Sequence, residues 1–413
     1  MDCYNYDGYS LSNTPNTILG LFGISSKDSL NPALYEKVLK GKKPKRIITL
    51  FIDGFGYMQW KKYYKRFEFL KRYTEKGSVT PITTVFPSTT AAAVTSVSTG
   101  TPPLQHGLAE WYIYMRKAGG IIATLPFRRM TNHTPDSLKN DDLTADDLFK
   151  GDAIFGRLKK RGVKSYVYIP KGISKSVYSG KAYRNSKLVP YSYLPDLFVS
   201  LRTQLKRENS SAYFYVYIPD LDSMEHSYGP YTEQYEAQLS VINHLLKTEL
   251  LDRISKEDAK DTVVIIIADH GQINVDPMKV LYLNNYKESI GFFELGDDGT
   301  PILPVGSPRD VFLHIKPDRL DEAQRYFARI LKDKAKVVMV ADLIRDGLFG
   351  KGDASEEFYR RIGNLAILPF GRNTVWWDFS PYEEFKFYGH HGGLSEEEML
   401  IPFAIAWLTD LLE

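Results

Sequence analysis

Short, continuous apolar runs recur along the chain and are rich in β-branched and aromatic side chains. They lack the alternation of a strand with one face in water, so they are typical of strands buried on both faces of a parallel sheet. Helical patterns lie between them, such as residues 152–161, which end at Gly162. This order predicts an α/β fold with a doubly wound, mostly parallel sheet. The runs are Arg46 to Ile52, Ser165 to Ile169, Ala212 to Ile218, Thr262 to Ala268 and Leu400 to Leu408.

The texture of the sequence changes between residues 276 and 385, where Gly, Pro and Asp are frequent. This stretch carries its own strand, helix and strand patterns, at 310–315, 321–332 and 336–340. We therefore expect an inserted α+β cap over residues 276–385. The rest, residues 1–275 and 386–413, is expected to form one core that closes with the last apolar run.

Composition narrows the class of protein. The 413 residues include 53 Lys and Arg against 50 Asp and Glu, a net charge of +3, which argues against a dedicated nucleic-acid or membrane-surface binder. The first residues lack the pattern of a signal peptide, and the longest aliphatic run is far shorter than the ~20 residues of a membrane helix. We expect a cytoplasmic protein without a membrane segment. The single cysteine, Cys3, excludes an internal disulfide and a cysteine-based zinc site.

Carboxylates and histidines follow the ends of three apolar runs. Asp53 follows the first, Asp222 and His226 follow the run that ends at 218, and Asp269 and His270 follow the run at 262–268. A single aspartate at such a place is usually a turn or capping residue, but the repetition favours a site at the carboxyl edge of the sheet. Asp222 and His226 are four apart, so one helical turn presents both to one ion. Carboxylate with imidazole suits a divalent metal, zinc or manganese.

Hydroxyl groups precede an alanine-rich helical pattern in the segment FPSTTAAAVT at 86–95. A helix N-terminus favours anions through its free N–H groups and its dipole. On its own such a hydroxyl is usually a helix cap. Beside a metal ion it can become an alkoxide that attacks phosphorus.

These motifs, in this order, resemble the type I phosphodiesterase/nucleotide pyrophosphatase family of the alkaline phosphatase superfamily. The matching segments are IDGFG at 52–56, VFPSTT at 85–90 with STG at 98–100, QHG at 105–107, DLDSMEHSYGP at 220–230, IIADHGQ at 266–272 and HHGGLSEEEMLIP at 390–402. The resemblance implies an alkaline phosphatase-like fold. It also implies hydrolysis of phosphodiester or pyrophosphate bonds in a small, nucleotide-like substrate.

The resemblance further implies two divalent metal ions, with zinc the first choice and manganese the second. One ion would be bound by Asp222, His226 and His391. The other would be bound by Asp53, Asp269 and His270, with Thr90 completing its shell as the nucleophile that forms a phosphothreonine. Among the eight histidines, His106 and His390 lie beside motifs without a defined role, and the background set is His133, His244 and His314.

The chain departs from the family where an asparagine usually binds a phosphate oxygen, because it carries Glu110 and Trp111 there. We take both as candidate substrate residues. The alternatives for Glu110 are a ligand to a third metal ion, a charge that repels a dianionic monoester, or a surface residue. Trp111 can stack on a base or simply pack.

Two other function classes stay open. One is a phosphomonoesterase or phosphomutase of the same superfamily, although the related mutases use serine and carry a differently placed insertion. The other is a binding module that has lost catalysis, against which the presence of all seven metal and nucleophile positions argues. The absence of a Cys- or Ser-x-Pro-x-Arg motif argues against a sulfatase. The sequence leaves the physiological substrate and the oligomeric state undefined.

Overall fold

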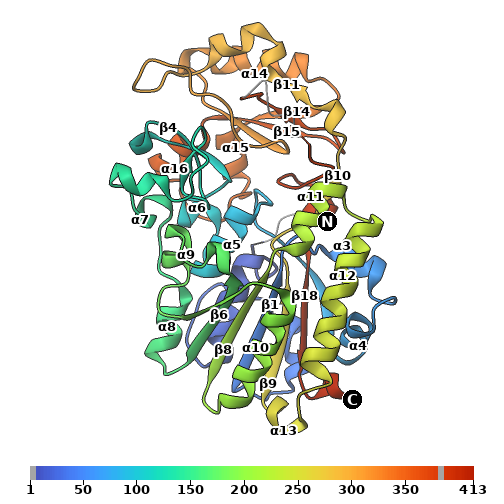
Figure 1. Ribbon diagram of the computed structural model, residues 1–413. Helices are drawn as coiled ribbons and strands as arrows, with labels where there is room; N and C mark the ends of the chain where they lie inside the picture. The colour runs from blue at the N-terminus through green and yellow to red at the C-terminus, as the bar shows by residue number, and fades with distance from the viewer. Residues whose placement is uncertain (1–5, 380–385) are drawn as a thin grey trace.

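The computed structural model describes residues 6–379 and 386–413 and contains two seven-stranded sheets. The first sheet fills the lower part of Figure 1 and the second lies above it. In spatial order the first sheet consists of β2 (Ser78–Thr83), β18 (Leu400–Trp407), β9 (Thr262–Ile267), β1 (Arg46–Ile52), β8 (Ala212–Ile218), β6 (Lys164–Pro170) and β7 (Lys187–Tyr191).

The first sheet is mostly parallel, as expected. β1 pairs in parallel with β8 on one side and β9 on the other, and β6 and β7 continue the parallel order. Every residue of β1, β8 and β9 is buried, which explains why these strands read as unbroken apolar runs. β18 runs antiparallel between β9 and β2. The last apolar run therefore forms an inner strand of this sheet.

Helices surround this sheet in two groups. α10 packs with α12 and α12 with α4, while α1 packs with α5 and α8. Figure 1 shows α10 and α12 in front of the strands. In chain order, the α-helices around both sheets are α1 (Thr14–Leu21), α2 (Glu36–Leu39), α3 (Tyr57–Tyr63), α4 (Glu68–Lys76), α5 (Thr90–Thr99), α6 (Pro103–His106), α7 (Ala145–Leu148), α8 (Ile154–Lys160), α9 (Val177–Ala182), α10 (Leu194–Arg207), α11 (Asp220–Tyr228), α12 (Glu233–Leu245), α13 (Lys256–Ala259), α14 (Leu320–Ile330), α15 (Val340–Arg345), α16 (Glu356–Ile362) and α17 (Glu396–Met399).

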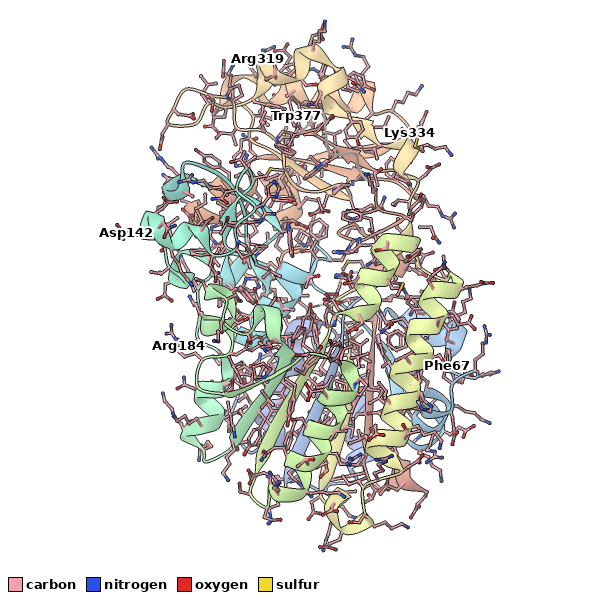
Figure 2. The ribbon with its side chains drawn as sticks, in the orientation of Figure 1. Phe67, Asp142, Arg184, Arg319, Lys334 and Trp377 are labelled. Carbon is pink, nitrogen blue, oxygen red and sulfur yellow. The ribbon has the colours of Figure 1, made fainter. Side chains whose placement is uncertain are left out.

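The second sheet is antiparallel throughout its pairs. Along β13 and β15 apolar side chains alternate between two buried clusters: Val311 and Ile367 pack with α14, while Phe312 packs toward the core loop that carries Phe86. In Figure 2 Trp377 lies inside this upper part and Arg319 at its outer edge. Its strands, in spatial order, are β14 (Ala335–Met339), β15 (Leu365–Pro369), β13 (Asp310–Leu313), β12 (Val305–Ser307), β3 (Tyr112–Met115), β4 (Gly120–Ala123) and β5 (Arg128–Arg129).

The second sheet is not made by the expected insertion alone. Residues 112–129, which the sequence analysis assigned to the core, supply β3, β4 and β5. They join the sheet where Tyr112 pairs with Gly306. The division at residues 276 and 385 stays a prediction.

Two small ladders complete the structure. β10 (Ile273–Asn274) pairs with β17 (Gly389–His390), and β11 (Leu281–Tyr282) pairs with β16 (Val375–Trp376). The first ladder brings the His390-His391 segment next to the chain that leaves β9. Of the helices in residues 6–379 and 386–413, none has both the length and the apolar character needed to cross a bilayer.

Candidate metal centre

The seven metal and nucleophile positions expected from the sequence come together at the carboxyl edge of the first sheet. Asp53 follows β1, α11 follows β8 and carries Asp222 and His226, and Asp269 and His270 follow β9. Gly54, with φ of +75°, turns the chain after Asp53, and a Cβ there would lie 3.0 Å from the Cα of Asp222. This turn therefore needs glycine to bring the ends of β1 and α11 into contact.

One group of possible metal ligands consists of Asp53, Asp269 and His270, all buried, with one ligand atom of each within 4.8 Å of the others. His270 Nε2 lies 3.1 Å from Asp269 Oδ2 and 3.7 Å from Asp53 Oδ1. Thr90 Oγ1 lies 3.2 Å from the same His270 nitrogen. The predicted nucleophile is thus adjacent to this group.

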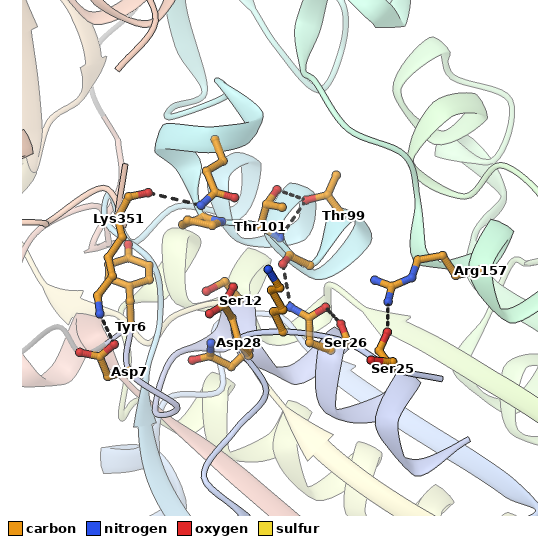
Figure 3. Close-up of a pocket in the computed structure, with 16 residues that line it drawn as sticks. Tyr6, Asp7, Ser12, Ser25, Ser26, Asp28, Thr99, Thr101, Arg157 and Lys351 are labelled. Carbon is orange, nitrogen blue, oxygen red and sulfur yellow. Dashed lines mark hydrogen bonds and ion pairs between the residues drawn. The ribbon is translucent and has the colours of Figure 1, made fainter. Parts of the chain in front are cut away.

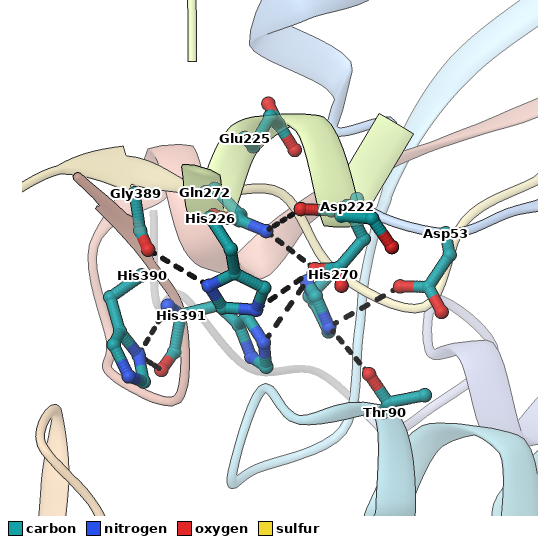
Figure 4. Close-up of polar contacts among 12 residues, drawn as sticks. Asp53, Thr90, Asp222, Glu225, His226, His270, Gln272, Gly389, His390 and His391 are labelled. Carbon is teal, nitrogen blue, oxygen red and sulfur yellow. Dashed lines mark hydrogen bonds and ion pairs between the residues drawn. The ribbon is translucent and has the colours of Figure 1, made fainter. Parts of the chain in front are cut away.

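A second group consists of Asp222, His270 and His391. His226 Nε2 lies 3.4 Å from Asp222 Oδ1, and His391 Nε2 lies 3.7 Å from that oxygen. The rings of His270 and His391 are stacked with centroids 3.6 Å apart. Figure 4 shows His270 between Asp53 and Thr90 on one side and the other two histidines on the other. His270 therefore borders both groups, whereas the sequence assigned it to one.

Each of these three histidines presents Nε2 to the site, because its Nδ1 is bonded to a backbone carbonyl. His226 Nδ1 lies 2.9 Å from Gly389 O, His391 Nδ1 lies 2.9 Å from Ser88 O, and His270 Nδ1 lies 3.2 Å from Gly271 O. A carbonyl only accepts, so Nδ1 carries a proton and Nε2 is the nitrogen that faces the site. For His270 burial is outweighed by the charges of Asp269 and Asp222, which raise the pKa of the imidazole. A hydrogen bond from Nδ1 to a backbone carbonyl is common in metal-binding histidines.

The carboxylates are oriented in the same way. Asp269 Oδ1 accepts hydrogen bonds from the N–H groups of Gly54 and His270, and Asp53 Oδ2 accepts one from the Tyr217 hydroxyl. Among the described residues, Asp53 Oδ1 and Asp269 Oδ2 receive no hydrogen bond, although both are buried. A buried carboxylate oxygen without a partner is costly, and a cation would offset that cost.

The pKa shifts fit the same interpretation. Burial, together with the charges of Asp269 and Asp222, raises the pKa of the Asp53 carboxyl well above its usual range. Burial, together with His270 and His226, holds the pKa of His391 well below its usual range, so its imidazole is neutral. Carboxylates together with imidazoles form the donor set that zinc and similar divalent ions take. The residues present therefore fit a metal centre.

Thr90 is the first residue of α5, and Thr89 is its N-cap. The main-chain N–H groups of the first turn of a helix have no partner within the helix, so they are available to an anion beside Thr90. Ala91, Ala92 and Ala93 are fully buried. The alanine run is thus a packing feature of the helix.

A cavity of about 420 Å³ opens beside Thr90, Asp53 and Asp222, and Trp111 is part of its wall. None of the residues that line it is Lys or Arg. Glu110 is fully buried, which rules out the alternative that it is a surface residue, and it does not line this cavity. Its role as a substrate residue stays a prediction. The other lining residues are Val94, Leu125, Pro126, Pro135, Gly172, Ile173, Ser176, Tyr178, Ser179, Tyr183, Tyr217, Pro219 and Ser223.

A second cavity, of about 470 Å³, lies between the N-terminal segment and the end of α5 (Figure 3). No residue of the candidate metal centre lines it. Its polar groups largely bond one another: Arg157 donates to the carbonyl of Ser25, and the hydroxyls of Thr99 and Thr101 are 2.8 Å apart. The geometry therefore concentrates the chemistry at the first cavity.

Sequence reasoning missed two residues that orient the ligands. Tyr217 holds Asp53, and Gln272 Nε2 donates to Asp222 Oδ1 over 2.5 Å. Gln272 follows the Asp269-His270-Gly271 segment directly and belongs to a matched motif, so the sequence did carry a signal for it. His106 bonds Ser96 over 3.0 Å and His314 bonds the Arg360 carbonyl, so both have structural contacts.

Known proteins show what this arrangement is similar to. Residues 47–393 match the family model described as type I phosphodiesterase / nucleotide pyrophosphatase. Among curated relatives, the chain is 26% identical over 210 residues to ectonucleotide pyrophosphatase/phosphodiesterase family member 1 of Homo sapiens, covering 49% of this chain and 20% of that protein. It is 22% identical over 313 residues to venom phosphodiesterase CdcPDE of Crotalus durissus collilineatus, covering 72% of this chain and 36% of that protein. The chain therefore spans well under half the length of either relative.

Solved structures share the fold. Murine ectonucleotide pyrophosphatase/phosphodiesterase 5, as an inactive variant in complex with AMP, matches with a TM-score of 0.63 and 16% identity, covering 89% of this chain and 92% of that one. Phosphonoacetate hydrolase from Sinorhizobium meliloti 1021 matches with a TM-score of 0.60 and 18% identity, covering 89% and 94%. The match over residues 47–393 is decisive: the chain belongs to the type I phosphodiesterase/nucleotide pyrophosphatase family.

Proposed function

We propose that this chain is a metal-dependent hydrolase of phosphodiester or pyrophosphate bonds that works through a phosphothreonine intermediate on Thr90. The proposed cofactors are two zinc ions. Asp53, Asp269 and His270 would hold one, and the ligands of the other would be Asp222, His226 and His391. Family membership supports the reaction class. The observation that carries the proposal is the 3.2 Å contact between Thr90 Oγ1 and His270 Nε2, a nitrogen that borders both ligand groups.

Different groups of the site would perform different parts of the reaction. Bound divalent ions would neutralise phosphoryl oxygens and lower the pKa of the Thr90 hydroxyl. Thr90 Oγ1 attacks phosphorus, the bond from phosphorus to the leaving oxygen breaks, and that oxygen keeps the electron pair. N–H groups at the start of α5 stabilise the negative charge that develops on the phosphoryl group. Water then attacks the phosphothreonine, which releases the phosphate product and restores the Thr90 hydroxyl.

The cavity beside Thr90 supports an uncharged substituent on the phosphoryl group. Its walls are mostly apolar or aromatic, and none of its lining residues is basic, so a second phosphate or a carboxylate would have no cation to pair with there. A nucleoside or aryl group fits these walls, with Trp111 as a stacking surface. The related structure in complex with AMP supports a nucleotide-like substrate. The cytoplasmic location stays a prediction.

The test compares a diester with a monoester. Protein stripped with EDTA is assayed with p-nitrophenyl thymidine 5′-monophosphate and with p-nitrophenyl phosphate, before and after zinc or manganese is added. We expect no turnover in the stripped protein. With metal we expect the diester to have a kcat/KM about a hundredfold higher than the monoester.

The opposite preference would indicate the phosphomonoesterase or phosphomutase alternative. Absence of turnover with either metal, despite metal binding, would indicate the binding-module alternative.

A further inference from the structure

Two acidic side chains from different parts of the chain meet beside the candidate metal centre. Glu110 follows α6, in the loop that leads to β3, and Asp310 is the first residue of β13 in the second sheet. Both are fully buried. Their carboxyl groups lie within hydrogen-bonding reach of each other. Two carboxylates placed together in a buried site repel each other unless something compensates.

Hydrogen-bond donors of the protein satisfy one oxygen of each of the two carboxyl groups. Glu110 Oε2 accepts a hydrogen bond from the N–H of Trp111, and Asp310 Oδ1 accepts one from the hydroxyl of Ser307. Among the described residues, neither Glu110 Oε1 nor Asp310 Oδ2 has a hydrogen-bond donor in good geometry, and the hydroxyl of Thr89 is the one other donor close to the Glu110 carboxyl. Two buried acceptors are therefore left without a donor, and a single hydrogen between them would satisfy both.

The charged groups around the pair do not remove the need for that hydrogen. Glu398 faces Asp310 and adds a further negative charge. The nearest guanidinium, that of Arg309, is committed to Glu398 through two hydrogen bonds of 2.9 Å. His270, which follows β9 of the first sheet, also acts on Glu110 and lowers the pKa of its carboxyl, but by less than burial raises it.

We propose that Glu110 and Asp310 share one proton, so that the protonated carboxyl of one donates a hydrogen bond to the carboxylate of the other. This hydrogen bond joins β13 of the second sheet to the loop between α6 and β3, beside the candidate metal centre. Ser307 extends this bridge, because its hydroxyl donates to Asp310 and also lies 3.4 Å from the carbonyl oxygen of His391. The proton bridge thus supports the loop that carries His391. Glu110 and Asp310 act here as positioning residues.

The direction of the pKa shifts agrees with the shared proton. Burial raises the pKa of Glu110 to about 7, and burial together with Glu110 raises the pKa of Asp310 well above its usual range. A carboxyl whose pKa is higher in the folded than in the unfolded state binds more protons when folded. Stability therefore falls as pH rises from the unfolded value, about 4.5, to the folded value.

Replacing either carboxyl with an amide keeps the hydrogen bond between the two side chains but removes the shared, titratable proton. In Glu110→Gln the amide oxygen can accept from the N–H of Trp111 while the amide nitrogen donates to Asp310 at every pH. In Asp310→Asn the amide oxygen can accept from Ser307 while the nitrogen donates to Glu110. The double variant places two donors face to face and loses the bridge. Glu233→Gln changes an exposed carboxyl and is the matched control.

The measurement is the melting temperature of the metal-loaded protein and its variants between about pH 5 and about pH 8. All variants keep every proposed metal ligand, so the effect of pH on the ligands cancels in the difference from wild type. We expect the melting temperatures of both single variants to rise relative to wild type as the pH increases. We expect the double variant to be less stable than either single variant at every pH.

Two results would overturn the shared proton: single variants whose difference from wild type is constant with pH, as for the control, or a double variant as stable as the single ones. Because these readouts need no turnover, a failure of the shared proton can be distinguished from a failure of the proposed reaction.

Discussion

At the scale of single residues, hydrogen bonds decide which atom each candidate ligand presents. Backbone carbonyls fix the tautomer of His226, His270 and His391, and main-chain N–H groups satisfy one oxygen of Asp269. The sequence predicted which residue types meet here, because Asp and His recur after the apolar runs. It did not predict the hydrogen bonds that orient these side chains, since those depend on which loops lie side by side.

Tyr217 shows why. Within the run at 212–218 it is one of several aromatic residues of a buried strand, and nothing in the sequence separates it from the others. Only the parallel register, which pairs Phe51 with Tyr217, brings its hydroxyl to Asp53.

Tyr217→Phe tests this contact. Without the hydroxyl, Asp53 Oδ2 loses its donor and the carboxylate is free to rotate. We expect the affinity for zinc, measured by competition with a chromogenic chelator, to fall about tenfold or more. Tyr168→Phe is the matched control, because the buried hydroxyl of Tyr168 has no partner among the described residues. Equal affinities for the two variants would show that Tyr217 does not orient the ligand.

At the scale of elements, long buried strands were predictable and short paired ones were not. β1 and β8 have the bounds expected from their apolar runs, and α14 (Leu320–Ile330) lies within two residues of its expected ends. β3 and β4 are four residues each around a Gly119-Gly120 turn, and β2 contains Pro81, a residue that usually argues against a strand. β3 and β4 pair with each other across this turn, whereas β2 becomes a strand because it pairs with β18 near the end of the chain.

Arg309 and Glu398 form the most deeply buried ion pair of an arginine or lysine among the described residues. Arg309 precedes β13 and Glu398 lies in α17, and both side chains are almost fully buried. We expect Arg309→Met to lower the free energy of unfolding by about 3–5 kcal/mol, because it leaves Glu398 charged and buried. Urea unfolding followed by circular dichroism measures this. Arg345→Met removes an exposed pair with Asp342 and should change stability by less than about 1 kcal/mol. Similar losses in both variants would contradict the argument.

At the scale of the whole molecule, fold class and family were predictable, whereas the composition of the second sheet was not. The order of motifs along some 350 residues identifies the family, because unrelated chains do not repeat six such motifs in order. Residues 112–129 join strands some two hundred residues away through a contact in which Tyr112 pairs with Gly306 while α16 packs on β3. No local pattern indicates that contact, although it places the loop with Glu110 and Trp111 between the two sheets.

The central claim is that Thr90 is the nucleophile of a two-metal phosphodiesterase. The most direct test is hydrolysis of p-nitrophenyl thymidine 5′-monophosphate by Thr90→Ala, with metal content measured on the same sample and Thr90→Ser as the matched control. The account predicts that Thr90→Ala loses turnover by about a thousandfold or more while it keeps about two metal ions per chain, and that Thr90→Ser retains measurable turnover. Activity of Thr90→Ala above a few per cent of wild type, with metal bound, would contradict it.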